Sequence, residues 1–369
     1  MKNRLKKYMF LISCLCLSVF MTGCGDEDPE AFVTEQMELA IAGNDQVTEM
    51  MLSQGLEELD GKYVLGFPDK LKESYCDFLS EACQNIRYEI VKCEKHNKGY
   101  KVKIELTPVD VADTMEICNE AYIRDLDTTD LCKAVTTLLL QNQELLDNPE
   151  EGRTELVTLY VKDDKQGFVF DDGEWEHCVS IMLTGYMDPY EKVADVLNSR
   201  DYLIATLDAI YKGDVESYAQ HMGLTEENAF QEYEKSFSTV DLTGTEMTEE
   251  QETRFTDSMK SMFANSSYEV GIARKAEDEG YLIQMTVTPN LSLQKSGAEF
   301  NKNVRSGRYG STEAVKEGYL QILEKYADSP VYDDAITFEF HMPAGNLLYN
   351  TTGDNEFEEL GEIIMPSVE

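Results

Sequence analysis

The sequence predicts an α+β protein: two tandem copies of an antiparallel sheet with helices packed on one face. Two observations predict this fold class. The chain of 369 residues repeats itself at a nearly constant spacing, and its strand patterns alternate between apolar and polar residues. No long apolar strand runs alternate with helices, and this excludes a doubly wound parallel sheet.

The internal repeat decides the domain organisation. Tyr-Glu-Ile at 88–90 recurs as Tyr-Glu-Val at 268–270, and the segment 99–108 recurs at 280–289, so one residue is inserted between the two blocks in the second copy. Further matches at similar offsets are Asp77 with Asp257, Asn85 with Asn265, Ala134-Val135 with Ala314-Val315, Leu140 with Leu320, and Glu174-Trp175-Glu176 with Glu356-Phe357-Glu358. Such constancy indicates a duplication.

Each copy then has about 170 residues, which is an ordinary size for a domain. We assign residues 31–187 to the first repeat and 188–369 to the second, after a short tether at 24–30. The boundary is placed near Met187 because Pro189 cannot continue a strand ladder.

Each copy is expected to run helix, strand, helix, strand. Apolar residues from Leu71 to Ala82 recur at helical spacing, whereas Tyr100, Val102, Ile104 and Leu106 alternate with polar residues as in a half-buried strand. Asn97 before Gly99 predicts a hairpin turn. Further helices are expected at 114–121 and 130–147, and further strands at 156–161, 167–170 and 174–183.

The N-terminus has the parts of a bacterial export signal. Residues 1–23 join a positive segment to an apolar run from Met9 to Met21, which is too short to cross a bilayer. The run ends in Met-Thr-Gly-Cys, which resembles the lipobox of bacterial lipoproteins, with Met21 in place of the usual Leu. The resemblance implies that Cys24 carries the lipid (diacylglycerol and palmitate-type acyl chains) and anchors the protein on the outer face of the membrane. The alternative is an ordinary secretory signal in which Cys24 is incidental.

The charge limits the kinds of partner. The formal net charge is −39, and removal of residues 1–23, with four positive charges and no acids, makes it −43. Nucleic acids require clustered Lys and Arg, so they are excluded as partners, and electrostatic docking on anionic lipid is excluded for the same reason. The membrane is therefore expected as a partner only through the lipid.

The element order resembles the cone-shaped, cystatin-like domain of the nuclear transport factor 2-like superfamily. The residues that carry the resemblance are the strand Gly-Tyr-x-Val-x-Ile-x-Leu-Thr-Pro at 99–108 and the turn Asp172-Gly173-Glu174-Trp175. The resemblance implies a lipid-anchored protein of unknown role from a Gram-positive bacterium of the Firmicutes or Clostridia type, with two tandem cone domains. The long helical insert after Pro108 departs from the minimal cone pattern.

The cysteines beyond the lipobox all lie in the first repeat. They are Cys76, Cys83, Cys93, Cys118, Cys132 and Cys178. The second repeat has Phe263 in place of Cys83 and Leu360 in place of Cys178, which indicates that these two cysteines are small core residues. Free thiols are the favoured interpretation, and up to three disulfides remain the alternative. No close pairs have the spacing of a metal site.

Catalytic and cofactor motifs are missing, so the sequence predicts no catalytic residue, no cofactor and no metal site. The pair His177-Cys178 is placed on a strand, where neighbours point to opposite faces, and His96, His221 and His341 are interpreted as surface residues. The acidic clusters at 163–164, 171–174 and 353–356 lack the spacing of a calcium loop and are interpreted as turns.

Two classes of function follow. The first is a membrane-anchored extracytoplasmic lipoprotein that is not an enzyme and acts as a binding or scaffolding module for an unknown envelope protein or small ligand. The second uses a cone pocket, either as an isomerase or dehydratase or as a solute-binding protein. An enclosed pocket that holds an acid or base with a shifted pKa would favour the enzyme.

The lipid anchor gives a first prediction. Cells that are fed a radioactive fatty acid should label the wild-type chain, and Cys24→Ala should abolish the label because the acceptor thiol is gone. A label that survives this substitution would show that Cys24 is not the lipid attachment site.

Overall fold

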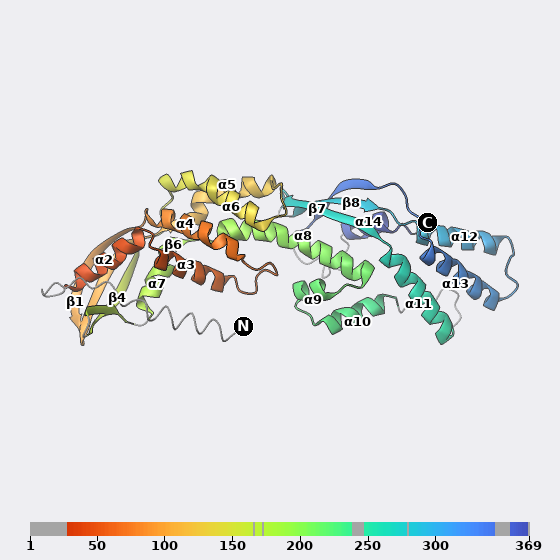
Figure 1. Cartoon of the computed structure of the whole chain (residues 1–369), viewed down its shortest axis with the longest axis horizontal. Coiled ribbons are helices and arrows are strands. Elements are labelled where there is room, and N and C mark those ends of the chain that lie inside the picture. The colour runs from red at the N-terminus through yellow and green to blue at the C-terminus, as the bar shows by residue number, and fades with distance from the viewer. Residues whose placement is uncertain are drawn as a thin grey trace.

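The computed structural model describes residues 28–164, 167–171, 173–237, 247–278, 280–343 and 355–367. These form two units that follow each other along an elongated molecule, with the N-terminal unit at the left of Figure 1 and the C-terminal unit at its right. Each unit combines an antiparallel sheet with helices, which confirms the predicted α+β class. The tether before Asp28, Cys24 and the export signal lie outside the described residues.

The first unit has a four-stranded antiparallel sheet in the order β1-β2-β4-β5 and a short parallel pair, β3-β6. Its elements are α2 (Pro29–Ile41), α3 (Asp45–Glu58), η1 (Asp69–Leu71), α4 (Lys72–Cys83), β1 (Arg87–His96), β2 (Gly99–Thr107), β3 (Val109–Asp110), α5 (Val111–Arg124), α6 (Leu131–Asn142), η2 (Gln143–Asp147), β4 (Glu155–Asp164), β5 (Gly167–Phe170), α7 (Glu174–Ser180) and β6 (Leu183–Thr184).

The second unit has a three-stranded antiparallel sheet in the order β7-β8-β9. Its elements are α8 (Asp188–Lys212), α9 (Glu216–Met222), α10 (Glu226–Ser236), α11 (Glu249–Ala264), β7 (Ser267–Lys275), β8 (Tyr281–Thr288), α12 (Ser292–Arg305), α13 (Thr312–Asp328), β9 (Ile336–Met342) and α14 (Asn355–Ile364).

The central strands show why these residues form half-buried sheets. In β2 the side chains of Val102, Ile104 and Leu106 are fully buried, while the alternate positions face away from the core. The buried alternation recurs in β8. A two-residue turn joins β1 to β2, and Asn97 takes the left-handed conformation there with φ 51°. One face of each sheet therefore forms the core under the helices.

The two units share backbone details as well as element order. The N–H of Asp110 donates to the carbonyl of Glu150 at 2.9 Å, and at the matching positions of the second unit the N–H of Leu291 donates to the carbonyl of Val331 at 2.8 Å. The register of each first hairpin also shifts at the same place, after Ile90 in β1 and after Val270 in β7. The helices and strands of the second unit can therefore be matched to those of the first.

The structure corrects one predicted element. The segment 174–183, expected as a strand, is helix α7 followed by the start of β6. Cys178, Val179 and Met182 are fully buried, and together with Trp175 they follow the spacing of one helical face. Gly173, with φ 80°, starts this helix.

The structure also corrects the alignment of α6 with α13. The sequence pairs Leu140 with Leu320, but Leu140 is 65% exposed while Leu320 is fully buried. Leu139 is buried, and pairing it with Leu320 keeps the same offset that relates the segment 99–108 to 280–289. The second unit therefore keeps the offset set by the one-residue insertion before the segment 280–289, and α6 aligns with α13 at this same offset.

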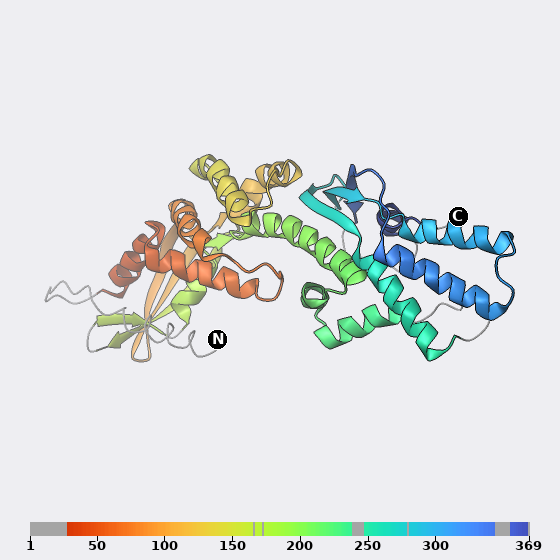
Figure 2. The same cartoon turned by 45° about the vertical axis from the view of Figure 1, so that its right-hand side comes forward.

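Helix α8 belongs to both units. Its 25 residues begin at Asp188, the first residue assigned to the second repeat, and the helix packs on α5 and α6 of the first unit and on β7 and α11 of the second. In Figures 1 and 2 it runs along the middle of the molecule between the two sheets. One continuous hydrophobic core extends from Val33 to Met365 through this helix.

Two contacts hold α8 in place, one polar and one aromatic. Near the middle of α8, the guanidinium of Arg200 donates to the carbonyls of Gly271 (2.7 Å) and Val270 (3.0 Å), where the register of β7 shifts. At the start of α8, Tyr190 packs against Phe67 with ring centroids 5.0 Å apart. These contacts hold α8 to both units.

A buried amide chain connects α5, α6 and α8. Asn142 donates to the side-chain oxygen of Asn119 at 2.7 Å, and Asn119 donates to the carboxylate of Asp188 at 2.7 Å. Both asparagines are fully buried. Burial raises the pKa of Asp188, while the hydrogen bond from Asn119 opposes this shift. Asn119 therefore links the amide of Asn142 to the carboxylate of Asp188.

Asn119→Ala should lower the free energy of unfolding by about 2–4 kcal/mol, because it leaves one buried amide and one half-buried carboxylate without this partner. Urea unfolding followed by circular dichroism measures the change. Ile117→Ala, at a position on the same helix that is 87% exposed, is the control and should leave the free energy nearly unchanged. A loss below about 1 kcal/mol for Asn119→Ala would show that the amide chain does not stabilise the joint.

Candidate functional site

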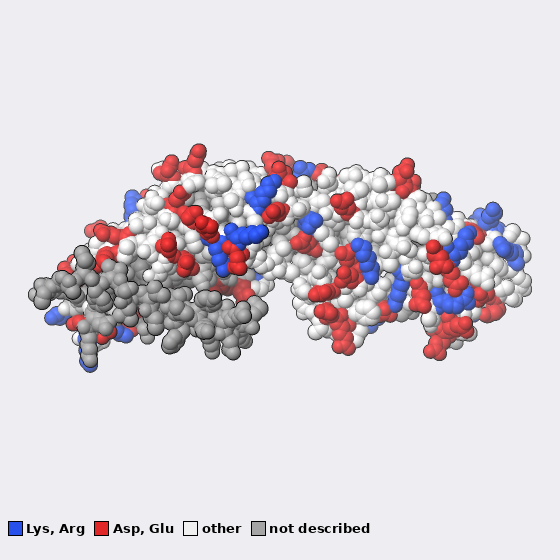
Figure 3. All heavy atoms as spheres, viewed as in Figure 1, with Lys and Arg blue, Asp and Glu red and all other residues white. Residues whose placement is uncertain are grey.

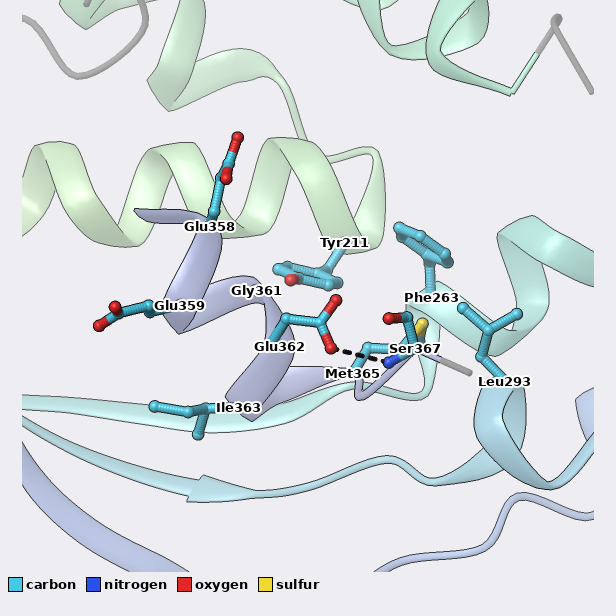
Figure 4. A pocket seen from close by; sticks show the side chains of 10 residues that line it. All are labelled: Tyr211, Phe263, Leu293, Glu358, Glu359, Gly361, Glu362, Ile363, Met365 and Ser367. Carbon is cyan, nitrogen blue, oxygen red and sulfur yellow. Dashed lines mark hydrogen bonds between the residues drawn. The ribbon is translucent and has the colours of Figure 1, made fainter. Parts of the chain in front are cut away.

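The second unit contains a hollow of about 810 Å³ on its helical side. Its walls come from the end of α8, the end of α11, the start of α12, and α14 with the residues that follow it (Figure 4). The lining residues are Tyr211, Phe263, Leu293, Glu358, Glu359, Gly361, Glu362, Ile363, Met365 and Ser367. It is open to solvent and does not lie inside a closed cone, so it is not the enclosed pocket on which the enzyme hypothesis depends.

Apolar and aromatic side chains form most of the hollow. The rings of Tyr211 and Phe263 stack with their centroids 5.6 Å apart and their planes at 26°. Phe237 meets the edge of Phe263 from the α10 side, at 5.3 Å. Leu293 and Met365 continue the apolar surface (Figure 4). Such a surface can bury an apolar group of a ligand or partner.

Three glutamates supply the charge of the hollow. Glu362 turns toward Ser367 and accepts a hydrogen bond from its backbone N–H at 2.9 Å, which lowers the pKa of this carboxyl (Figure 4). Burial, with the nearby charge of Glu362, raises the pKa of Tyr211 to about 12. Glu362 is therefore ionised and Tyr211 neutral at ordinary pH, so these two groups do not form an acid–base pair.

His341 fixes the first turn of α14. Its Nε2 lies 3.0 Å from Oδ1 of Asp278 in the turn between β7 and β8, and its Nδ1 lies 3.5 Å from Oε1 of Glu356. The hydrogen bond with Asp278 and the two negative charges raise the pKa of His341. The sequence led us to interpret His341 as a surface residue and did not predict these contacts. This ion pair was missed because Asp278 is 63 residues away along the chain.

The other three histidines of the sequence do not line the hollow. His96 is exposed beside the ring of Tyr160, and His221 is half-buried against Tyr202, where burial lowers its pKa. His177 is exposed on α7, whereas its neighbour Cys178 is buried. Among the described residues, no three or more His, Cys, Asp or Glu side chains are arranged to hold a metal ion.

All six cysteines of the first unit are separate thiols. Cys83 and Cys178 are buried, and this burial raises the pKa of each thiol to about 12. Their positions match those of Phe263 and Leu360 in the second unit, which also contact the core. They therefore fill space in the core, as the repeat predicts.

On the face shown in Figure 3, the charged side chains do not gather into one region. Asp and Glu side chains are spread over both units there, with Lys and Arg between them. No helix in the described ranges is long and apolar enough to cross a membrane. Cys24, the predicted lipidation site, lies outside these ranges.

Comparison with known proteins gives one structural likeness. No family model and no curated protein matches the chain. The crystal structure of YcdA from Bacillus subtilis, described as a candidate lipoprotein, aligns with 76% of this chain and 96% of its own, at 16% identity and a TM-score of 0.34. At this level the likeness assigns neither a family nor a function, and the nuclear transport factor 2-like resemblance stays a prediction.

The contacts of His341 predict a pH dependence. A histidine with a raised folded pKa stabilises the folded state fully below its unfolded value of about 6.5, and this contribution is lost as the pH rises through the folded pKa. His341→Gln should therefore lower the urea midpoint more at pH 5.5 than at pH 8.5. An equal difference at the two pH values would show that the charge of His341 does not hold α14.

Proposed function

We propose that the protein is a lipid-anchored lipoprotein on the outer face of the membrane that binds an envelope partner through the hollow of its second unit and catalyses no reaction. The export signal and the lipobox ending in Cys24 support the location. The observation that carries the binding role is the open apolar hollow, about 810 Å³ in size, beside α14.

The chemistry of the hollow favours binding over catalysis. An acid–base enzyme needs a group whose pKa is close to the working pH. Among the described residues that line the hollow there is no histidine or cysteine, the pKa of Glu362 is lowered, and the pKa of Tyr211 is raised. Stacked aromatic rings and aliphatic side chains instead suit the burial of a partner's apolar surface.

A photo-crosslinking residue in place of Leu293 tests the proposal in cells that express the full-length chain. Leu293 lines the hollow, so illumination should give an adduct in the membrane fraction. The same residue in place of Ile117, which is 87% exposed on α5 of the first unit, is the control and should give little or no such adduct. Equal yields at both positions, or no adduct at Leu293, would contradict binding at the hollow.

A further inference from the structure

The first unit contains the counterpart of the hollow, and there a helix fills it. Helices α4 and α7 of the first unit correspond to α11 and α14 of the second. In the first unit α3 packs on both α4 and α7. Figure 1 shows α3 lying beside α4 and α7 in the N-terminal unit.

Specific contacts of α3 fall on the positions that match the lining of the hollow. The sulfur of Met51 lies 3.7 Å from the thiol of Cys83, and Cys83 corresponds to Phe263. The side-chain amide of Gln54 donates to the carbonyl of Glu176 at 3.0 Å, and Glu176 corresponds to Glu358. Both counterparts line the hollow.

Helix α3 packs closely against the residues that surround it. The hydroxyl of Tyr186 donates to the carbonyl of Met51 at 2.8 Å. A Cβ on Gly55 would come within 2.6 Å of the side chain of Met187, so the helix backbone approaches this wall directly. The buried face of α3 consists of Val47, Thr48, Met51, Leu52 and Gly55.

The matching segment of the second unit lies elsewhere. Helices α2 and α8 are both followed by a left-handed glycine, Gly43 and Gly213, and the chain then enters α3 in one unit and α9 in the other. Helix α9 packs on α8, and together with α10 it forms a small separate core around Tyr218 and Ala229. Within the described ranges α9 and α10 make no extensive contact with α14, and Phe237 at the end of α10 meets only the edge of the Phe263 ring. Figures 1 and 2 both show α9 and α10 apart from α14.

The hollow of the second unit differs in shape and charge from its filled counterpart in the first unit. Val179, buried in α7, corresponds to Gly361 in α14, so the wall of the second unit lacks a side chain there. The part of its lining that the structure describes includes Glu358, Glu359 and Glu362 but neither Lys nor Arg. An occupant that carries positive charge near these carboxylates would be complementary to them.

We propose that the hollow accepts an amphipathic helix of a partner protein, with an apolar face like that of α3 and basic residues along its edges. The inference rests on the proposed binding function and names the class of partner. Helix-in-groove recognition places apolar side chains of successive turns in the groove, as α3 does with Val47 and Met51.

A synthetic helix that copies α3 tests this class. The peptide spans residues 44–60, and Lys replaces four of its five exposed acids, Asp45, Glu49, Glu57 and Glu58, while the apolar face is unchanged. It is titrated onto the full-length chain in detergent, with the unchanged acidic peptide as the comparison. We expect the basic peptide to bind at least about tenfold more tightly than the acidic one.

Charge reversal on the protein separates recognition from non-specific association. The double variant Glu358→Lys with Glu359→Lys should lower the affinity for the basic peptide at least about fivefold and raise the affinity for the acidic peptide. The matched control is Glu35→Lys with Glu38→Lys, at two exposed positions on α2, and it should change neither affinity. Circular dichroism checks that each variant is folded.

Three outcomes would overturn the proposed partner. If both peptides bind alike to every variant, charge does not select the occupant. If neither peptide binds while the Leu293 adduct still forms, the partner is not such a helix, and the binding function stands. If that adduct has twice the mass of the chain, the occupant is a second copy. Absence of both peptide binding and the adduct would contradict the binding function itself.

Discussion

The burial of α8 against both units is the constraint on which the rest of the structure depends. A helix of 25 residues is about 37 Å long, and here its buried positions run from Pro189 to Tyr211. Because one hydrophobic core passes through it, the two units cannot separate without exposing that core. The hydrogen bonds of Arg200 and Asn119 fix the orientation of α8, since each pairs a specific polar group of α8 with one of a neighbouring element. The hollow, whose wall includes Tyr211 near the end of α8, is thereby fixed relative to the first unit.

The duplicated units keep their sheets and differ in how the groove between two helices is covered. Each unit has a hairpin with the same register shift, and the same backbone hydrogen bonds lie beside the following helices. The segment after the first helix differs: α3 fills the groove against Cys83, whereas α9 packs on α8. Helix α10 packs on α9 and reaches the groove only at its end, where Phe237 meets the edge of Phe263. One architecture thus provides a filled groove in the first unit and, in the second, an open hollow that we propose as a binding site.

The sequence predicted the repeat, the central strands and the helical stretches because their apolar periods are long and regular. It failed at α7, where a short segment from Trp175 to Met182 has both strand-forming residues and a helical apolar face, and only the contact with the core decides between them. It could not place the hollow, because the lining joins Tyr211, Phe263, Leu293 and the C-terminal helix, which lie far apart along the chain. The substitution of Cys83 by Phe263 in the repeat was visible, yet its meaning depended on the position of α3.

Thiol reactivity at equivalent positions tests most directly whether one groove is covered and the other open. The variant Phe263→Cys places a thiol in the second unit at the position that Cys83 occupies in the first. We expect an alkylating reagent to modify the thiol at position 263 in the folded protein, while Cys83, fully buried next to Met51 of α3, reacts only after unfolding. Mass spectrometry of the separated peptides reads both sites in one sample. A thiol at position 263 that is as protected as Cys83 would contradict an open groove in the second unit.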